Sequence, residues 1–388
     1  MARGKPSDAV VICDWLPPDF GAVGQYALRF ARRDVAQGQT IVLVGMSRAA
    51  TSVLEEPIGE RTLTLVRMRA SPTPRDALLR RALWTVATNV RLVWHALPYL
   101  RATREVAFTG SPPFLVHLLV PLARLLGIRT RYRITDFFPE CLMATYARVP
   151  AWLNALYGLT NYWRRRVDCY EALGEDQKVR LEEIGIPAAR IAVVPNDSPI
   201  AFGSEVRPAP RPPALRDVPV VLYSGNYGVA HEVETFIAGW RRYNEMHAAP
   251  VGLWLNAIGA GADAVDAMAA ALPFPYARTP PVALDALAGV LLAADIHLIT
   301  LRDAFVGYVL PSKVYACVDS GKPILFVGSA RSDVHRVCAR SVPAERYRRV
   351  EVGDVAGVTD ALAALLRAAA RTERDARMAP SRESGSRP

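Results

Sequence analysis

The strongest constraint on the fold is an alternation of short apolar runs with amphipathic stretches, repeated on both sides of a proline-rich segment. Alternation of this kind predicts parallel sheets covered by helices. In the first half we predict strands at residues 9–13, 40–44, 104–109, 129–135 and 191–194, and helices at 23–36 and 113–127.

The second half repeats the pattern after five prolines crowd residues 208–219, which regular structure does not tolerate. There we predict strands at 220–224, 253–258, 296–300 and 324–327, and helices at 231–246, 262–271, 313–320 and 358–370. The expected organisation is an N-terminal Rossmann-like domain (1–200), a linker (201–218), a C-terminal Rossmann-like domain (219–370) and a disordered tail (371–388). Two doubly wound domains are expected to face a central cleft, with ligands at the carboxyl ends of the strands.

The chain of 388 residues carries 47 Lys and Arg against 37 Asp and Glu, a net charge of +10. This excess favours an anionic partner such as a nucleotide phosphate or a membrane surface, although an ordinary solvated surface explains it as well. No recognisable nucleic-acid-binding module accompanies the charge, so we expect no nucleic-acid partner.

Five scattered cysteines form neither a zinc-type spacing nor a disulfide pattern, so we expect reduced thiols and no metal or cofactor. Residues 1–8 are polar and unlike a signal peptide, and the longest apolar stretch, 114–128, is too short and too interrupted to span a bilayer. These features predict a cytoplasmic protein.

The first candidate motif, residues 19–25, follows the first strand and opens a helix. Gly21 and Gly24, followed by Gln25, let main-chain N–H groups approach an anion at a helix start. A tight strand-to-helix turn is the alternative.

Residues 223–228 repeat this arrangement in the second half. Gly225, Asn226 and Gly228 can cradle a diphosphate on main-chain donors, and His231 follows three residues later. A structural turn and a packed histidine are the alternatives.

A third motif covers residues 305–315. Pro311 is suited to the first turn of a helix, which places Ser312 and Lys313 near unpaired N–H groups where a phosphate fits. A surface lysine after a helix cap is the alternative.

A fourth motif ends a predicted strand with Asp136 and Glu140 beside aromatic residues. The two carboxylates can orient sugar hydroxyls or act as an acid or base, or they can simply cap a helix. His117, which follows Ser111 and two prolines, is a further catalytic candidate or a packed histidine.

Residues 75–104 form a basic, aromatic stretch with apolar residues at helical spacing. Such a helix lies on an anionic membrane surface or packs on its own domain. The apolar positions are Leu79, Leu83, Val86, Val90, Val93 and Leu97, and the flanking arginines include Arg80, Arg81 and Arg91.

Seven segments occur in the order typical of bacterial family-four glycosyltransferases of the GT-B fold, in the branch that builds exopolysaccharide and lipopolysaccharide sugars. They are WLPP (15–18) with Gly21 and Gly24, DFFPE (136–140), VVPN (193–196), LYSGNYG (222–228), AADIHL (293–298), PSK (311–313) and GKPI (321–324). Residues 9–368 therefore resemble that family.

The resemblance implies a nucleotide-diphosphate-sugar donor in the C-terminal half, a lipid-linked or free saccharide acceptor in the N-terminal half, and metal-independent transfer with retention. It implies that Lys313 stabilises the leaving group, beside Gly225, Asn226, Gly228 and Ser312 at the diphosphate. It also implies that Gly21 and Gly24 complete the phosphate site.

The chain departs from the family at the glutamate pair that precedes the Gly-x-Pro segment, where Tyr308 and Ala316 stand. The basic pair that often follows the glycine loop is also missing, with Val229, Ala230 and His231 in that region. Three alternatives therefore remain: a catalytically silent GT-B partner subunit, a sugar-nucleotide epimerase, and a transferase with a soluble small-molecule acceptor.

Overall fold

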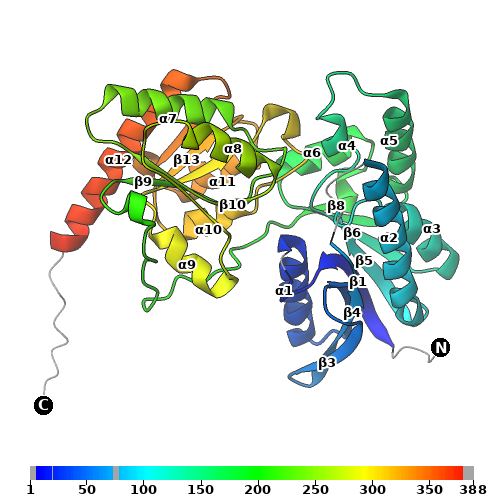
Figure 1. Cartoon of the computed structure of the whole chain (residues 1–388). Coiled ribbons are helices and arrows are strands. Elements are labelled where there is room, and N and C mark those ends of the chain that lie inside the picture. Colours follow the sequence, from blue (N-terminus) through cyan, green and yellow to red (C-terminus); the bar gives the residue numbers. More distant parts are fainter. Residues whose placement is uncertain (1–5, 20, 73–77, 379–388) are drawn as a thin grey trace, which may run out of the picture. The chain divides into compact units, whose positions relative to one another are not determined.

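The computed structural model describes residues 6–19, 21–72 and 78–378, which form two α/β units (Figure 1). The N-terminal unit extends to Pro199 and also contains the segment Gly307–Leu310. The C-terminal unit comprises Ile200–Val306 and continues from Pro311. The chain therefore returns to the N-terminal unit for four residues just before it reaches Lys313.

The N-terminal unit contains a sheet in the order β3-β4-β2-β1-β5-β6-β7-β8. All neighbours are parallel except β3 and β4, an antiparallel edge hairpin that the sequence reading missed. The hairpin is half exposed and carries Glu55, Glu56 and Pro57, which protect a sheet edge from further pairing. The strand bounds are β1 Ser7–Trp15, β2 Ile41–Ser47, β3 Ser52–Ile58, β4 Arg61–Arg69, β5 Thr103–Thr109, β6 Arg129–Ile134, β7 Cys169–Ala172 and β8 Ile191–Val193.

Helices cover both faces of this sheet because apolar side chains point alternately to each side of the strands. Ala9 and Cys13 pack with α1 on one face, whereas Val10 and Ile12 pack with α2 and α3 on the other. The helices are α1 Ala22–Ala36, α2 Leu78–Leu100, α3 Val116–Leu126, α4 Glu140–Met143, α5 Ala151–Arg164 and α6 Glu175–Glu183.

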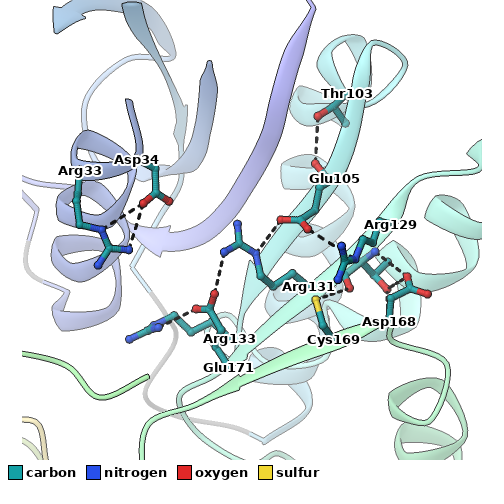
Figure 2. A network of polar contacts seen from close by, with 11 residues as sticks. Arg33, Asp34, Thr103, Glu105, Arg129, Arg131, Arg133, Asp168, Cys169 and Glu171 are labelled. Carbon is teal, nitrogen blue, oxygen red and sulfur yellow. Dashed lines mark hydrogen bonds and ion pairs between the residues drawn. The ribbon is translucent and has the colours of Figure 1, made fainter. Parts of the chain in front are cut away.

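On the α1 face, the helix contacts β1 to β4, and the neighbouring strands β5 to β7 present charged side chains instead. Figure 2 shows Arg131 bonded to Glu105 and Glu171, at 2.8 Å each, with Arg133 bonded to the second oxygen of Glu171 at 2.8 Å. An open hollow lies between this ladder and α1, where Phe30 stacks under Arg133. Arginine–carboxylate pairs thus replace apolar packing on this part of the sheet.

The C-terminal unit contains a parallel sheet in the order β11-β10-β9-β12-β13-β14. The strand order reverses between β9 and β12, which makes their carboxyl ends the topological switch point where ligands of such sheets bind. The strand bounds are β9 Val220–Asn226, β10 Gly252–Ile258, β11 Tyr276–Thr279, β12 Ile296–Thr300, β13 Ile324–Val327 and β14 Tyr347–Val350.

Two buried apolar clusters hold the helices of this unit on the two faces of the sheet. Trp240 of α7 is completely buried, and its indole N–H donates to the carbonyl of Val251 at 2.7 Å. The helices are α7 Glu234–Met246, α8 Ala260–Ala270, α9 Leu284–Leu292, α10 Lys313–Asp319, α11 Asp333–Ser341 and α12 Val355–Met378.

The proline-rich segment 201–218 packs against the C-terminal unit. Leu215 is completely buried, the N–H of Ala209 donates to Gly289 at 2.8 Å, and Arg211 pairs with Asp295 at 2.9 Å. The expected boundary of the tail at residue 371 falls inside α12, because a run rich in arginine, glutamate and alanine continues the helix to Met378. Residues 379–388 lie outside the described residues.

Within the described part of the chain, no helix is both long enough and apolar enough to cross a membrane.

Candidate functional site

The switch point of the C-terminal unit is formed by the last residues of β9 and β12. Gly225 ends the regular part of β9 with φ of +119°, a conformation that side chains rarely adopt. Thr300 is the last residue of β12 and is completely buried. The backbone thus turns sharply at the place where a parallel sheet binds ligands.

Lys313 reaches this point from the start of α10. Its ammonium nitrogen lies 3.2 Å from the centre of the Tyr223 ring and 3.8 Å from where a Cβ on Gly225 would stand. The ammonium is buried and has no hydrogen-bond partner among the described residues. Burial lowers the pKa of Lys313 to about 7. A buried cation whose partner is an aromatic ring is electrostatically incomplete, and an anion beside it would restore its charge.

His231 is almost fully buried beside the same ring. Its Nδ1 lies 2.7 Å from the carbonyl of Thr300, so Nδ1 carries the proton and Nε2 is an acceptor. Burial and the neighbouring charge of Lys313 lower its pKa to about 3. His231 is therefore neutral, and its Nε2 suits a hydroxyl donor such as a sugar and not a phosphate.

The other residues predicted to bind the donor differ in their exposure and in their backbone contacts. Asn226 is exposed, and the carbonyl of Gly228 accepts the N–H of His231 at 3.1 Å. Pro311 is buried and Ser312 is half-buried immediately before α10. Because α10 is only seven residues long, the side chain of Lys313 and not the helix end supplies the positive charge here.

Tyr308 belongs to the N-terminal unit, whereas the other residues predicted to bind the donor belong to the C-terminal unit. Its carbonyl accepts the N–H of Phe137 at 3.0 Å, and Arg180 lies 5.0 Å from its ring centre. The returning segment is held by Asp136, which forms a β-bridge with Val309. Position in the sequence could not reveal this return.

A second polar group lies at the switch point of the N-terminal unit, between β1 and β5. Asp14 is buried near the end of β1, and Ser111, just after β5, donates its hydroxyl to Asp14 at 3.0 Å. Burial raises the pKa of Asp14 to about 7, against smaller opposing effects of the bonds from Ser111 and the backbone of Gly24. Asp14 therefore titrates near neutral pH, as a general base does.

Gly21 and Gly24 allow α1 to approach β1 closely. A Cβ on Gly24 would stand 1.9 Å from the carbonyl oxygen of Trp15, and one on Gly21 would stand 2.9 Å from the Trp15 side chain. The N–H of Gln25 donates to Gly21 at 3.2 Å within the first turn. The tight-turn alternative thus has a clear steric basis, and the nearby carboxyl group of Asp14 disfavours a phosphate when it is ionised.

Asp136 follows β6 at the same edge of the N-terminal sheet. Burial raises its pKa to about 6, and its charge adds to the rise at Asp14. A Cβ on Gly110 would stand 2.9 Å from the backbone of Asp136, so the β5 and β6 ends are in close contact. Asp14, Ser111 and Asp136 therefore form one carboxylate-rich group, which we call the carboxylate site.

Glu140 and His117 have structural partners in the N-terminal unit. Both carboxylate oxygens of Glu140 bind the guanidinium of Arg164, a side chain with no exposed surface. Nε2 of His117 contacts the hydroxyl of Thr160 on α5 at 3.0 Å, and burial lowers the pKa of His117. His117 is thus packed, as its alternative reading predicted, whereas Glu140 is held in an ion pair and does not cap α4, which has no side-chain cap among the described residues.

The sequence reading missed Asp14 and Thr300 as members of the two groups, and it gave no role to Tyr223, the first residue of the second motif. An acidic residue inside an otherwise apolar strand was the available signal for Asp14, because burying a carboxylate is costly. Thr300 acts through its backbone, which leaves no trace in residue type. Among the described residues, no three His, Cys, Asp or Glu side chains are arranged to hold a metal ion.

Neither a protein-family profile nor a curated protein sequence matches the chain, but solved structures do. An α,α-trehalose-phosphate synthase (UDP-forming) from Burkholderia vietnamiensis aligns with a TM-score of 0.62 at 12% identity over 96% of each chain. WaaG, a glycosyltransferase involved in lipopolysaccharide biosynthesis, aligns with a TM-score of 0.59 at 13% identity over 96% of each chain. "Trehalose-6-phosphate from E. coli bound with UDP-2-fluoro glucose" aligns with a TM-score of 0.54 at 13% identity, covering 94% of this chain and 96% of that one.

These likenesses concern the fold, since the sequences are only 12–13% identical. The chain has the GT-B architecture of glycosyltransferase structures, with two Rossmann-like units built on parallel sheets. The predicted fold class is confirmed.

Proposed function

We propose that this protein is a metal-independent, retaining glycosyltransferase of the family-four type. It moves a hexose from a nucleotide-diphosphate-sugar to a saccharide or polyprenyl-linked acceptor at the cytoplasmic face of a bacterial membrane, in surface polysaccharide biosynthesis. The observation that carries the proposal is the buried ammonium of Lys313, which has no hydrogen-bond partner among the described residues.

The donor diphosphate supplies the anion that Lys313 lacks. Gly225 lies directly beside the ammonium, since the position that its Cβ would take is 3.8 Å from the nitrogen. Negative charge grows on the diphosphate as the bond to the sugar breaks. A cation held in place before the reaction stabilises this charge without reorganisation.

His231 complements this role toward the sugar. Its unprotonated Nε2 can accept a hydrogen bond from a hydroxyl, and the bond between Nδ1 and Thr300 fixes the ring. A neutral acceptor beside a cation suits a ligand that has both hydroxyl and phosphate groups.

The carboxylate site is assigned to the acceptor. Asp14 and Asp136 titrate near neutral pH, and Ser111 offers a hydroxyl beside Asp14. Groups of this kind bind sugar hydroxyls and can take the proton that the acceptor loses. The resemblance of the sequence to surface-polysaccharide enzymes and the likeness in fold to WaaG support a saccharide acceptor.

A catalytically silent GT-B subunit is the second candidate. The two positions that carry glutamates in many family members are Tyr308, which packs in the N-terminal unit, and Ala316, which is buried. The arrangement at Lys313 favours the enzyme.

The test is a thermal-shift panel of nucleotides and nucleotide-sugars with the wild type, Lys313→Met and the control Lys178→Met on α6. A ligand that binds only the folded state raises the free energy of unfolding by mass action, by about 2.7 kcal/mol at 100 times its Kd. This stabilisation appears as a higher Tm. We expect one nucleotide-sugar to stabilise the wild type and the control but not Lys313→Met. With that donor and candidate acceptors, NMR of the product then reports whether the anomeric configuration is retained.

If no nucleotide stabilises the wild type, the donor site is wrong. If a donor binds but no acceptor yields a product, the silent-subunit candidate takes its place.

A further inference from the structure

Helix α2 exposes an apolar stripe to solvent along much of its length. Leu79, Leu83, Val86, Val90 and Trp94 are between 50% and 70% exposed. Their spacing places them on one side of the helix over sixteen residues, about 22 Å. Large apolar side chains on one continuous stripe are unusual on a surface that meets only water.

The opposite side of α2 already packs on the N-terminal sheet. Leu92, Ala96 and Leu100 are completely or almost completely buried in the core with β1, β2 and β5. The helix is thus apolar on both sides, and the packing alternative accounts for only one of them.

The neighbouring helices α3 and α5 also expose large apolar side chains. Helix α3 contacts both α2 and α5, and the three lie together on one face of the sheet (Figure 1). Half of the exposed large apolar residues in the described ranges lie on these three helices. They are the five residues of the α2 stripe, Leu125 and Leu126 of α3, and Trp152, Leu159 and Tyr162 of α5.

The charged residues of these three helices have one sign. The sequences of α2, α3 and α5 contain no aspartate or glutamate. Arg80 and Arg81 of α2 and Arg124 of α3 are exposed, and Arg166, just beyond α5, lies 3.5 Å from the Tyr162 ring centre. We call the exposed apolar residues and arginines of these helices the α2–α3–α5 face.

Apolar residues flanked by cations, with tryptophans and a tyrosine among them, match the boundary between headgroups and acyl chains of an anionic bilayer. Arginine stems can lie along the apolar region while their guanidinium groups bind phosphates. A second copy of this chain would bring the same positive charges together, which disfavours self-association through this face.

We propose that the α2–α3–α5 face docks on an anionic membrane surface, with the α2 stripe at the level of the headgroups. This deepens the proposed function and rests on it for the identity of the acceptor, since a docked N-terminal unit meets lipid-linked saccharides at the bilayer. The docking itself requires neither donor nor catalysis.

Sedimentation with vesicles tests the proposal, using phosphatidylcholine vesicles with and without phosphatidylglycerol. Two double variants change the face: Leu83→Ser with Val86→Ser, and Arg80→Glu with Arg81→Glu. Met246→Ser and Arg242→Glu on α7 are matched controls, since both residues are exposed on the C-terminal unit. Thermal unfolding verifies that each variant folds.

We expect the wild type and both controls to bind the anionic vesicles, less strongly at high salt. Each double variant should lower the vesicle partition coefficient at least tenfold. Failure of the folded wild type to bind anionic vesicles would overturn the proposal, as would equal binding by the serine variant. A wild-type dimer, seen by light scattering, that the serine variant dissociates would assign the face to a second copy.

Lys313→Met separates this proposal from the proposed function. It should bind vesicles like the wild type while losing its response to nucleotide-sugars. For the wild type, absence of vesicle binding with an intact nucleotide response would refute the docking face alone, and vesicle binding without any nucleotide response would refute the donor site alone.

Discussion

The ammonium nitrogen of Lys313 lies 3.2 Å from the centre of the completely buried Tyr223 ring. The ring attracts the cation but cannot replace the water that the ammonium loses, so burial lowers the pKa of Lys313 to about 7. The positive charge at this switch point therefore depends on pH and on whether an anion is present.

Nucleotide binding should weaken as pH rises above about 7. Lys313 loses its proton in the free protein over that range, and a neutral amine attracts no diphosphate. If binding requires the ammonium, the affinity falls by up to about tenfold for each pH unit above the pKa. Titration calorimetry from pH 7 to 9 measures this decline, and Lys313→Met should bind weakly with little pH dependence. A wild-type affinity that is constant over this range would refute the role of the ammonium.

Lys313→Met should stabilise the protein in the absence of ligand. The pKa of Lys313 is lower in the folded state than its ordinary value of 10.5, so the unfolded chain binds more protons between pH 7 and 10. Wild-type stability attributable to this residue therefore rises with pH over that range and is poorest below pH 7. At pH 6.5 we expect a higher Tm for Lys313→Met than for the wild type, by roughly 2–4 °C for each kcal/mol of added unfolding free energy. The difference in Tm should be smaller at pH 9. A lower Tm of the variant at pH 6.5 would contradict this expectation.

Arg164→Met should destabilise the N-terminal unit strongly. Both partners of the Glu140–Arg164 pair are buried, so the substitution leaves a carboxylate without its cation. The expected loss is about 3–5 kcal/mol in urea unfolding. Adding Glu140→Gln should recover part of it, because the remaining amide is neutral. If the double variant is less stable than Arg164→Met, the ion pair is not the main role of Glu140.

Gly24→Ala should disrupt the contact between α1 and β1. The new methyl group would overlap the carbonyl oxygen of Trp15, 1.9 Å from the Cβ position. We expect a loss of more than about 2 kcal/mol. Gly158→Ala on α5 is the control, since nothing lies within 4 Å of its Cβ position, and it should gain about 1 kcal/mol of helix propensity. Equal effects of the two substitutions on urea midpoints would show that the close approach is not needed.

Asp14→Asn should reduce the dependence of stability on pH. The pKa of Asp14 is raised to about 7 in the folded state, so its contribution is fully present below pH 4 and is lost as pH rises through about 7. The asparagine side chain of the variant cannot ionise, so the variant should not lose this contribution to stability at pH 8. Unfolding free energies at pH 5 and pH 8 measure the difference, and the wild type should lose more between them. A larger loss in the variant would place the titrating carboxyl group elsewhere.

Much of the fold follows from local patterns. The strands at β1, β2, β5, β6, β8 to β10, β12 and β13 were predictable because buried parallel strands read as short apolar runs between turn residues. The edge hairpin of β3 and β4 was not, since exposed strands carry charged residues such as Glu55 and Glu56. The short strand β7 carries Glu171, whose burial depends on Arg131 and Arg133 from a neighbouring strand.

The sequence by itself determined the two Rossmann-like units and the motifs at their strand ends, because hydrophobic periodicity and glycine or proline placement act over a few residues. Only the tertiary structure decided what those motifs do. Sheet topology brought Lys313 to Gly225 and Ser111 to Asp14, while the returning segment placed Tyr308 in the other unit. Burial then set the charges, since a lysine or an aspartate acquires a pKa near 7 only when distant parts of the chain exclude water from it.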